Sequence, residues 1–283
     1  MASPAFVAAS TAGNAVGTDL TITKPTGVVD GHILTVVLYR EAGAWTPPAG
    51  WTQWGSDQHN FRTPTNDMIL SVYWKRASSE PANYVFALSS STFRVAAMAA
   101  WSGSISSGDP ADVSIVPNAD NSTSVATAKS ITTVTADTMA IAFHGNFNGS
   151  NVKVSTSGYT QATGGFLGGC EIWYKATAAI GATGDKAFGV SPTLAGADSA
   201  TFHIAIKPTA TLSIDQEGFR FRNDDGSESA ASWLANQDVN ISQPALVNTR
   251  LRILVNATGD PASQRYKLRY RKVGDDGWRD LGT

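Results

Sequence analysis

The chain has few of the residues that reactive or metal-bound sites usually need. Its 283 residues include one cysteine and four histidines. The single cysteine, Cys170, excludes an internal disulfide, and the sequence contains no Cys/His cluster at zinc-ligand spacing. It also lacks a Gly-x-Ser-x-Gly turn, a His-Glu-x-x-His pair and a phosphate-binding glycine loop. We therefore expect a protein that is not an enzyme and that is stabilised by packing.

Charge is also scarce, and the two signs nearly cancel. Charged residues are 16% of the chain, 21 basic against 23 acidic, for a net charge of −2. Such a balance produces no overall field toward nucleic acid or an anionic membrane. The sequence has no run of 18 apolar residues, and Met1–Ala12 lacks the basic start and apolar core of a signal peptide. We expect a product made in the cytoplasm, with no nucleic-acid partner and no membrane insertion.

Apolar residues are plentiful and follow strand patterns. Hydrophobic residues make up 42% of the chain, and the run Ile33–Tyr39 is nearly continuous, which is typical of a central strand covered on both faces. Met68–Lys75 and Phe93–Ala99 alternate in side-chain direction, which predicts strands with one face packed and the other less so. Phe6–Ile22 is expected to add an edge strand. The fold class is predicted to be all-β.

Part of the chain is duplicated. We interpret residues 25–103 and 130–207 as two divergent copies of one unit. One match aligns His32 with Met139, and another aligns Phe93 with Phe202. The matching segments are Asp30–Val37 with Asp137–Phe143, Ala49–Gln53 with Ser157–Gln161, Val72–Ala77 with Ile172–Ala176, and Thr92–Ala96 with Thr201–Ala205.

Composition divides the chain into two domains. The first 207 residues carry 11 basic and 13 acidic residues, whereas residues 208–283 carry 10 of each in a much shorter segment. We expect residues 1–207 to form a single jelly-roll-like β-sandwich body, since one copy alone has a thin core. Residues 208–283 are expected to form a second β domain, whose strands alternate apolar with basic residues so that one face is core and the other is solvated.

Several segments resemble known module families. The Tyr266–Arg271 strand, the Gly274–Gly277 turn and Trp278 are similar to part of a fibronectin type III or immunoglobulin-like module. Gly218–Glu228 resembles segments of tailed-bacteriophage structural proteins, and Gly27–Gly31 with Pro48–Trp51 is similar to β-sandwich modules of phage virion and bacterial surface proteins. The resemblance implies a virion setting. Because the chain stops at Thr283, the C-terminal module is expected to be either completed by a neighbouring subunit or a truncated or reduced form.

Aromatic residues supply the candidate ligand or partner site. Trp45, Trp51 and Trp54 lie in a Pro-containing loop, where exposed rings stack on sugars or anchor a protein. Trp51 has a counterpart in the second copy, Tyr159, so both are expected to plug a sandwich end. Trp45 and Trp54 have no aromatic counterpart and are the candidates for binding.

Two groups of charged residues are candidate binding sites, and each also has a simpler structural interpretation. Asp224, Asp225 and Glu228 flank a glycine and offer the oxygen ligands that Ca²⁺ prefers, but their spacing does not match a full EF-hand loop, and a plain turn is the alternative. A row of basic side chains in the second domain, called the basic stripe, either binds an acidic partner or belongs to a solvated face of mixed charge. We favour the turn and the solvated face. The stripe comprises Arg220, Arg222, Arg250, Arg252, Lys267, Arg269 and Arg271.

The histidines do not form a catalytic group in the sequence. His144 and His203 lie in predicted strands of the second copy, where a hydrogen-bonded or surface histidine is the simpler interpretation. We therefore expect no cofactor beyond the candidate Ca²⁺.

The function predicted from the sequence is a non-enzymatic structural or adhesion component of a tailed-phage virion, either associated with a tail fibre or tail tip or decorating the capsid. Its expected partners are other virion proteins and copies of itself, with host-surface glycans as a further candidate. The alternative is a carbohydrate-binding module of a bacterial surface or secreted protein that uses Trp45 and Trp54. An enzyme fragment is the least favoured interpretation.

Overall fold

The chain forms two compact units, residues Met1–Thr209 and Ala210–Thr283, in a computed structural model. Its described residues are all strand, turn or irregular, which confirms the all-β class. The sequence-based boundary after Lys207 lies two residues before the end of the first unit. The described residues are 3–63, 66–120, 125–146, 158–163, 169–189, 199–210, 213–224, 226, 230, 232–244, 247–258, 269–271, 274, 276–277 and 279–280.

The first copy builds one antiparallel sheet of seven strands. Its order is β1-β7-β2-β6-β4, with β3 paired to β7 and β5 to β6. The central position of β2 explains why all eight of its side chains are buried. The strands are β1 (Ala5–Thr23), β2 (Ile33–Arg40), β3 (Trp45–Thr46), β4 (Thr52–Gln53), β5 (Gln58–Thr63), β6 (Asn66–Arg76) and β7 (Asn83–Ser102).

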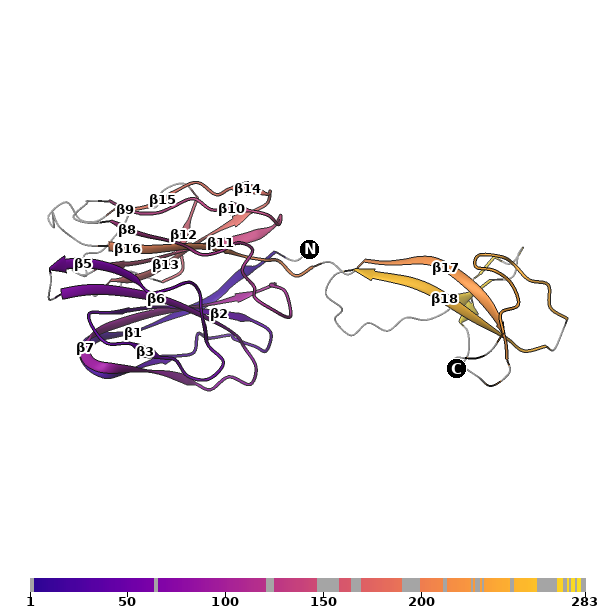
Figure 1. The fold of residues 1–283 in the computed structure, drawn as a ribbon, viewed down its shortest axis with the longest axis horizontal. Coiled ribbons are helices and arrows are strands. Elements are labelled where there is room, and N and C mark those ends of the chain that lie inside the picture. Colours follow the sequence, from indigo (N-terminus) through magenta and orange to yellow (C-terminus); the bar gives the residue numbers. More distant parts are fainter. Residues whose placement is uncertain are drawn as a thin grey trace. The chain divides into compact units, whose positions relative to one another are not determined.

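The second copy builds a separate sheet with the corresponding strand order. That order is β8-β16-β11-β13-β12, in which β11 takes the place of β2 between its two neighbours. Two further pairs, β9 with β15 and β10 with β14, lie on its outer side (Figure 1). The strands are β8 (Val116–Asp120), β9 (Val125–Ala128), β10 (Thr132–Thr133), β11 (Thr138–Asn146), β12 (Thr160–Gln161), β13 (Cys170–Thr177), β14 (Gly181–Ala182), β15 (Lys186–Gly189) and β16 (Ser199–Ile206).

The ladders correct the alignment of the two copies. Ile33 pairs with Arg76 and Met139 with Ala176, so Ile33, and not His32, corresponds to Met139. Successive side chains of a strand point to opposite faces, so the one-residue difference decides which residues face the other sheet. Ile33 and Met139 both belong to the layer between the sheets.

The ladders also correct the second match, which aligned Phe93 with Phe202. Val37 pairs with Ala97 in the first copy, and Phe143 pairs with Phe202 in the second. Phe202 therefore corresponds to Ala97 and not to Phe93. The Thr-Phe motif that suggested the match occupies different positions along the two strands.

Three apolar layers hold the first unit together. The central layer lies between the sheets and takes buried side chains from both copies, including Val37, Leu70, Phe143 and Phe202. The sheets approach so closely that a Cβ on Gly145 would lie 2.5 Å from Leu70 Cδ1. Each copy also has an outer layer of its own, around Phe86 in the first copy and Phe188 in the second.

The outer layer of the first copy forms because β1 and β7 bend together. Their ladder has irregularities after Phe6, Gly13 and Gly17, and beyond them Asp19–Thr23 pairs with Asn83–Ala87 over the outer face of the sheet. Gly13 has φ +104°, and a Cβ there would lie 2.4 Å from the Arg94 carbonyl oxygen. The bend therefore requires glycine at this position.

The strands expected to have one packed face and one less packed face are in fact covered on both faces. Val95–Trp101 in β7 is buried at every position, as is Met68–Tyr73 in β6. The alternation in these strands divides side chains between two apolar layers rather than between core and solvent.

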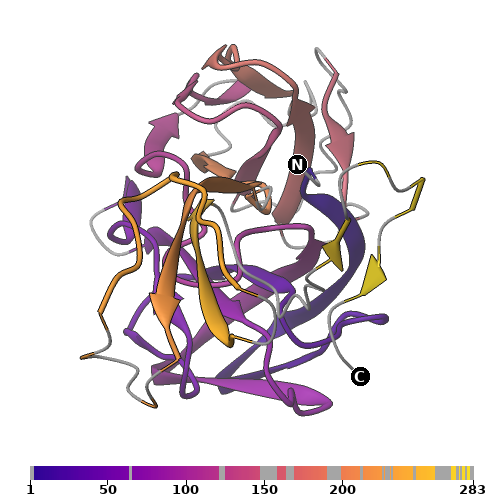
Figure 2. The ribbon, with the colours of Figure 1, turned by 90° about the vertical axis from the view of Figure 1, so that its right-hand side faces the viewer.

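The second unit contains two short ribbons among its described residues. Strands β17 (Ser213–Asn223) and β18 (Thr249–Thr258) pair antiparallel (Figure 2), and β19 (Arg269–Tyr270) pairs with β20 (Arg279–Asp280). A segment at Ser232–Asp238 bonds to the free edge of β17. Tyr266 and Trp278, which carried the fibronectin-like resemblance, lie outside the described residues.

A cavity in the layer between the sheets should destabilise both copies together. Phe143→Ala removes a fully buried ring that contacts side chains of both sheets. We expect a loss of about 3–5 kcal/mol in the free energy of unfolding and one cooperative transition for the first unit, measured by urea denaturation with circular dichroism. The control Val134→Ala, at a side chain 62% exposed, should change stability by about 0.5 kcal/mol or less. Two separate transitions would contradict a shared core.

Candidate functional site

The two candidate tryptophans are not exposed. Trp45 is 8% exposed and Trp54 is 5% exposed, so the prediction that these rings project into solvent is wrong. Trp45 packs in the outer layer of the first copy, and Trp54 packs in the layer between the sheets. Large aromatic rings gain most by burial, and the bent strands leave room for them inside.

Trp51 and Tyr159 fill the outer layers of their copies, as their matched positions suggested. Trp51 is 7% exposed and makes edge contacts to Tyr84 and Phe86, with ring centres 5.2 and 5.4 Å away. Tyr159 is 3% exposed and lies in the outer layer of the second copy. Both rings are therefore buried core residues, but they lie in the outer layers of their copies rather than in the layer between the sheets.

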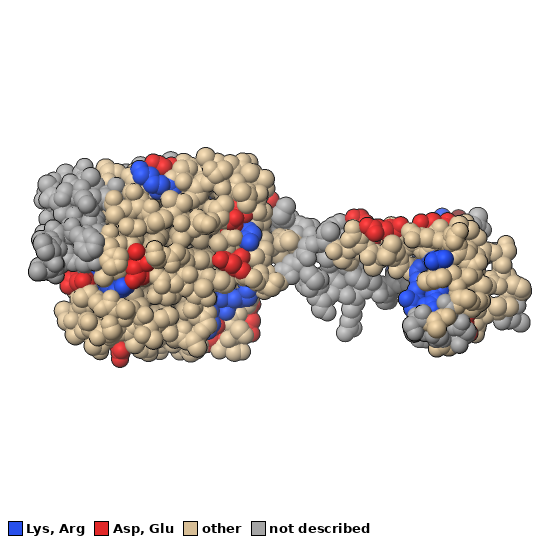
Figure 3. All heavy atoms as spheres, in the orientation of Figure 1, with Lys and Arg blue, Asp and Glu red and all other residues tan. Residues whose placement is uncertain are grey.

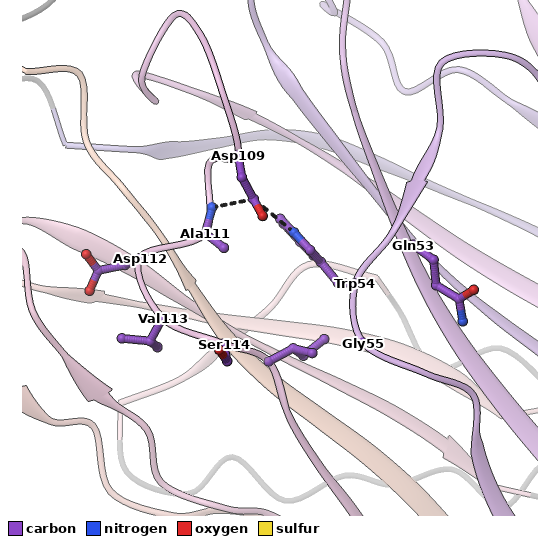
Figure 4. A pocket seen from close by; sticks show the side chains of 9 residues that line it. Gln53, Trp54, Gly55, Asp109, Ala111, Asp112, Val113 and Ser114 are labelled. Carbon is purple, nitrogen blue, oxygen red and sulfur yellow. Dashed lines mark hydrogen bonds between the residues drawn. The ribbon is translucent and has the colours of Figure 1, made fainter.

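A pocket of about 600 Å³ lies beside Trp54 (Figure 4). It is formed where the loop after β4 meets the segment that links the two copies, between Asp109 and Ile115. One third of the lining residues come from the first copy and two thirds from the linking segment, so the pocket depends on how this segment packs against the first copy. The residues that line it are Gln53, Trp54, Gly55, Asp109, Ala111, Asp112, Val113, Ser114 and Ile115.

Trp54 forms a fixed wall of this pocket. Its Nε1–H donates to Asp109 Oδ1 at 3.1 Å, and the same oxygen accepts from the Ala111 backbone N–H at 2.9 Å. Its ring stacks on Trp74, with centres 5.7 Å apart and planes 22° from parallel. Because one ring face and the indole N–H are already used and only 5% of the residue is exposed, the side chain offers little of its surface to a ligand.

The carboxylates at the pocket serve structural roles. Asp112 points away from Trp54 (Figure 4), and its Oδ2 accepts from the backbone N–H groups of Val134 at 2.7 Å and Thr135 at 3.3 Å. It therefore ties the linking segment to the second copy. The pocket presents hydrogen-bonding groups without a nucleophile and base in contact, which suits binding of a small polar molecule better than catalysis.

A buried polar cluster supports the wall formed by Gln53. Gln53 Nε2 donates to Asp57 Oδ1 at 2.7 Å, Ser71 Oγ donates to the same oxygen at 2.7 Å, and Arg40 forms a salt bridge with Asp57. Partial burial favours a higher pKa for Asp57, but the hydrogen bonds from Arg40, Ser71 and Gln53 and the charge of Arg40 outweigh it and lower the pKa. The carboxylate thus stays ionised and holds the cluster in place.

The candidate Ca²⁺ ligands are not brought together by the described residues. Asp224 Oδ1 instead accepts from Arg250 Nε at 2.6 Å. Asp225 and Glu228 lie outside the described residues. Among the residues that the structure does describe, no three His, Cys, Asp or Glu side chains are grouped as metal ligands would be.

The second copy has a buried polar cluster that sequence analysis missed. Lys186 is fully buried, and its Nζ lies 4.3 Å from the centre of the Trp173 ring and 5.0 Å from that of Phe188. Burial lowers the pKa of Lys186 to about 8, an effect that the nearby negative charge of Glu171 opposes. The only sequence signal was the alternation of Lys186 with Phe188 in a short strand, which placed both side chains on one face.

His203 and His144 occupy two places in this cluster. His203 Nδ1 donates to the Lys129 carbonyl at 2.8 Å, and Nε2 accepts from the Tyr159 hydroxyl at 2.7 Å. The hydrogen-bonded histidine expected here is therefore confirmed for His203. His144 is also fully buried, but it stacks on Phe188, with Nδ1 3.9 Å from Glu171 Oε2. It is neither hydrogen-bonded within the described residues nor on the surface.

Comparison with protein-family models, with curated proteins and with solved structures finds no match for this chain. In the part of the chain that the structure describes, no helix has the length and apolar character needed to cross a bilayer. The site itself must therefore carry the functional argument.

Burial of His203 predicts a pH-dependent stability. Burial lowers the pKa of His203 to about 4, whereas the unfolded chain binds this proton near pH 6.5. Between these values the unfolded state holds more protons, so the free energy of unfolding should fall by about 3 kcal/mol as pH drops from 6.5 to 4. The lowered pKa of Asp57 acts below this window.

The measurement is urea denaturation across pH 4–7. His203→Gln should make the curve less steep over this range, with a smaller slope left by His32, whose pKa burial also lowers. The control His59→Gln, at an exposed side chain, should leave the curve unchanged. An equally steep curve for His203→Gln would show that another group is responsible.

Proposed function

We propose that the chain is a non-enzymatic structural component of a tailed-phage virion, placed on a tail fibre, a tail tip or the capsid surface. In this proposal the first unit is a jelly-roll-like body, and the second is an immunoglobulin- or fibronectin-like module. The protein is made in the host cytoplasm and enters the particle by contacts with other virion proteins and with copies of itself. The segments of the sequence that resemble virion modules support this setting.

The observation that carries the proposal is the apolar surface of the second unit. Leu251 and Val255 lie on one face of β18 and are 43% and 56% exposed. A two-stranded ribbon has little core of its own, and grouped apolar side chains at a surface mark contacts with another protein. Among the described residues, Val239 and Val247 of the same unit are also more than 40% exposed.

The first unit supports the same role as a rigid carrier. Its apolar side chains fill three internal layers, and Arg40, Ser71 and Asp57 form a polar cluster inside it. Such a body withstands assembly without needing a ligand or a disulfide. The proposal thus assigns rigidity to the first unit and subunit contacts to the second.

Association through β18 is tested by light scattering after size exclusion. The full chain should form oligomers or bind assembled particles of the virus that encodes it. The double variant Leu251→Thr, Val255→Thr changes two side chains on one face and places threonine, a residue that strands favour, at both positions. It should weaken association by about tenfold or more, as loss of buried apolar area requires.

The matched control is Val134→Thr, Ile180→Thr, which changes two side chains of the first unit that are each 62% exposed. Association should be unaffected by it. A chain that stays monomeric at all concentrations and never binds the particles would refute the proposed role.

A second candidate function, carbohydrate binding, is favoured by the pocket beside Trp54. On a glycan array the full chain should bind a sugar that Trp54→Phe no longer retains, because Phe lacks the N–H that fixes Asp109. Trp45→Phe, at a ring outside the pocket, is the control. Absence of binding to every glycan would eliminate this candidate.

A further inference from the structure

One face of the β17–β18 ribbon carries facing arginines. Arg220 lies directly opposite Arg252, and Arg222 opposite Arg250, in the antiparallel ladder. Figure 3 shows basic side chains gathered on this part of the second unit. Like charges directly opposite one another destabilise a sheet, so this arrangement requires compensation. Asp224 provides part of it by its salt bridge with Arg250.

Trp233 lies against the same arginines. The guanidinium carbons of Arg220 and Arg222 are 4.3 and 4.9 Å from the centre of its ring. Arg222 is only 2% exposed, which corrects the expectation that the whole stripe is solvated, whereas Trp233 keeps 42% of its surface exposed. The indole therefore covers Arg222 and still presents a large area to solvent.

A pocket of about 300 Å³ opens between Arg220, Arg252, Trp233 and Gln237. Arg220 Nε donates to the Ala235 carbonyl at 2.8 Å, which fixes the guanidinium in orientation. Within the described residues its two Nη groups have no hydrogen-bond acceptor. A planar guanidinium held in this way presents a pair of donors that matches the two oxygens of a carboxylate.

We propose that this pocket binds a carboxylated saccharide. The carboxylate accepts from the two Nη groups of Arg220 beside Arg252, and the sugar ring packs on the exposed part of Trp233. The volume fits about one sugar residue with its acid group. This inference goes beyond the proposed particle role and does not depend on it.

The charge distribution favours one acid group over an extended polyanion such as nucleic acid. Asp215 and Glu217, on the same strand as Arg220, are exposed, and Figure 3 shows acidic side chains along an edge of this unit. A polyanion that followed the ribbon would meet these carboxylates and be repelled. A single carboxylate at Arg220 and Arg252 avoids them.

The test is calorimetric titration of the full chain with an oligomer of galacturonic acid at low salt. The acid should bind, and the methyl ester of the same oligomer, which has identical rings without charge, should bind about tenfold more weakly or not at all, as loss of a charge-assisted hydrogen bond predicts. Equal binding of acid and ester, or no binding of either, would overturn the proposal. Inorganic phosphate is titrated as a second anion, and competition by phosphate with equal strength would show simple anion binding instead.

Variants locate the site. Arg220→Gln and Arg252→Lys should each weaken binding of the acid by about tenfold or more, since the first removes the charge and the second removes the paired donors. Arg269→Gln changes an exposed arginine outside the pocket and should bind normally. Circular dichroism confirms that each variant is folded. Unchanged binding by folded Arg220→Gln and Arg252→Lys would refute this location, and the acid–ester comparison needs no variant.

Discussion

The first unit depends on the apolar layer between its two sheets. Each sheet alone would leave one face of its central strand in water, and only the other copy covers that face. Val37 in β2 and Phe143 in β11 hold corresponding positions and belong to the same layer. Burial of apolar surface is the dominant favourable term in folding, so each sheet depends on the other for its stability.

The copies differ most where they bury polar groups. Arg40 and Ser71 of the first copy correspond to Asn146 and Glu171 of the second, as their places in the ladders show. In the first copy the arginine is neutralised by Asp57. In the second, Lys186 lies among aromatic rings near Glu171. Each solution satisfies a buried charge locally, because an unpaired one would cost several kcal/mol. Each cluster therefore favours the side-chain arrangement seen in its own copy.

Much of the fold could be predicted because strands leave a local signal. The continuous apolar run of β2 and the match of Trp51 with Tyr159 led to the right strand and the right packing. The burial of Trp45 and Trp54 could not be predicted from local sequence. Trp45 packs in the outer layer that the bent strands β1 and β7 cover, and Trp54 packs in the layer between the sheets. A local motif also misplaced Phe202, because hydrogen-bonded register is set by the partner strand.

In the second unit, too, the strands could be predicted from local sequence and the tertiary contacts could not. The alternation of arginine with apolar residues in β17 and β18 predicted both strands. That Trp233 would cover Arg222 could not be foreseen, because these residues are brought together by a bridge between β17 and a later segment. The candidate pocket between Arg220 and Arg252 also depends on this tertiary contact.

Hydrogen exchange of the backbone amides in β2 and β11 tests the shared layer most directly. If the sheets stabilise one another, the slowest amides of both central strands should exchange only through global unfolding, with the same free energy of opening. Exchange in β11 at a clearly lower free energy than in β2 would show that the second copy opens independently and would contradict the account.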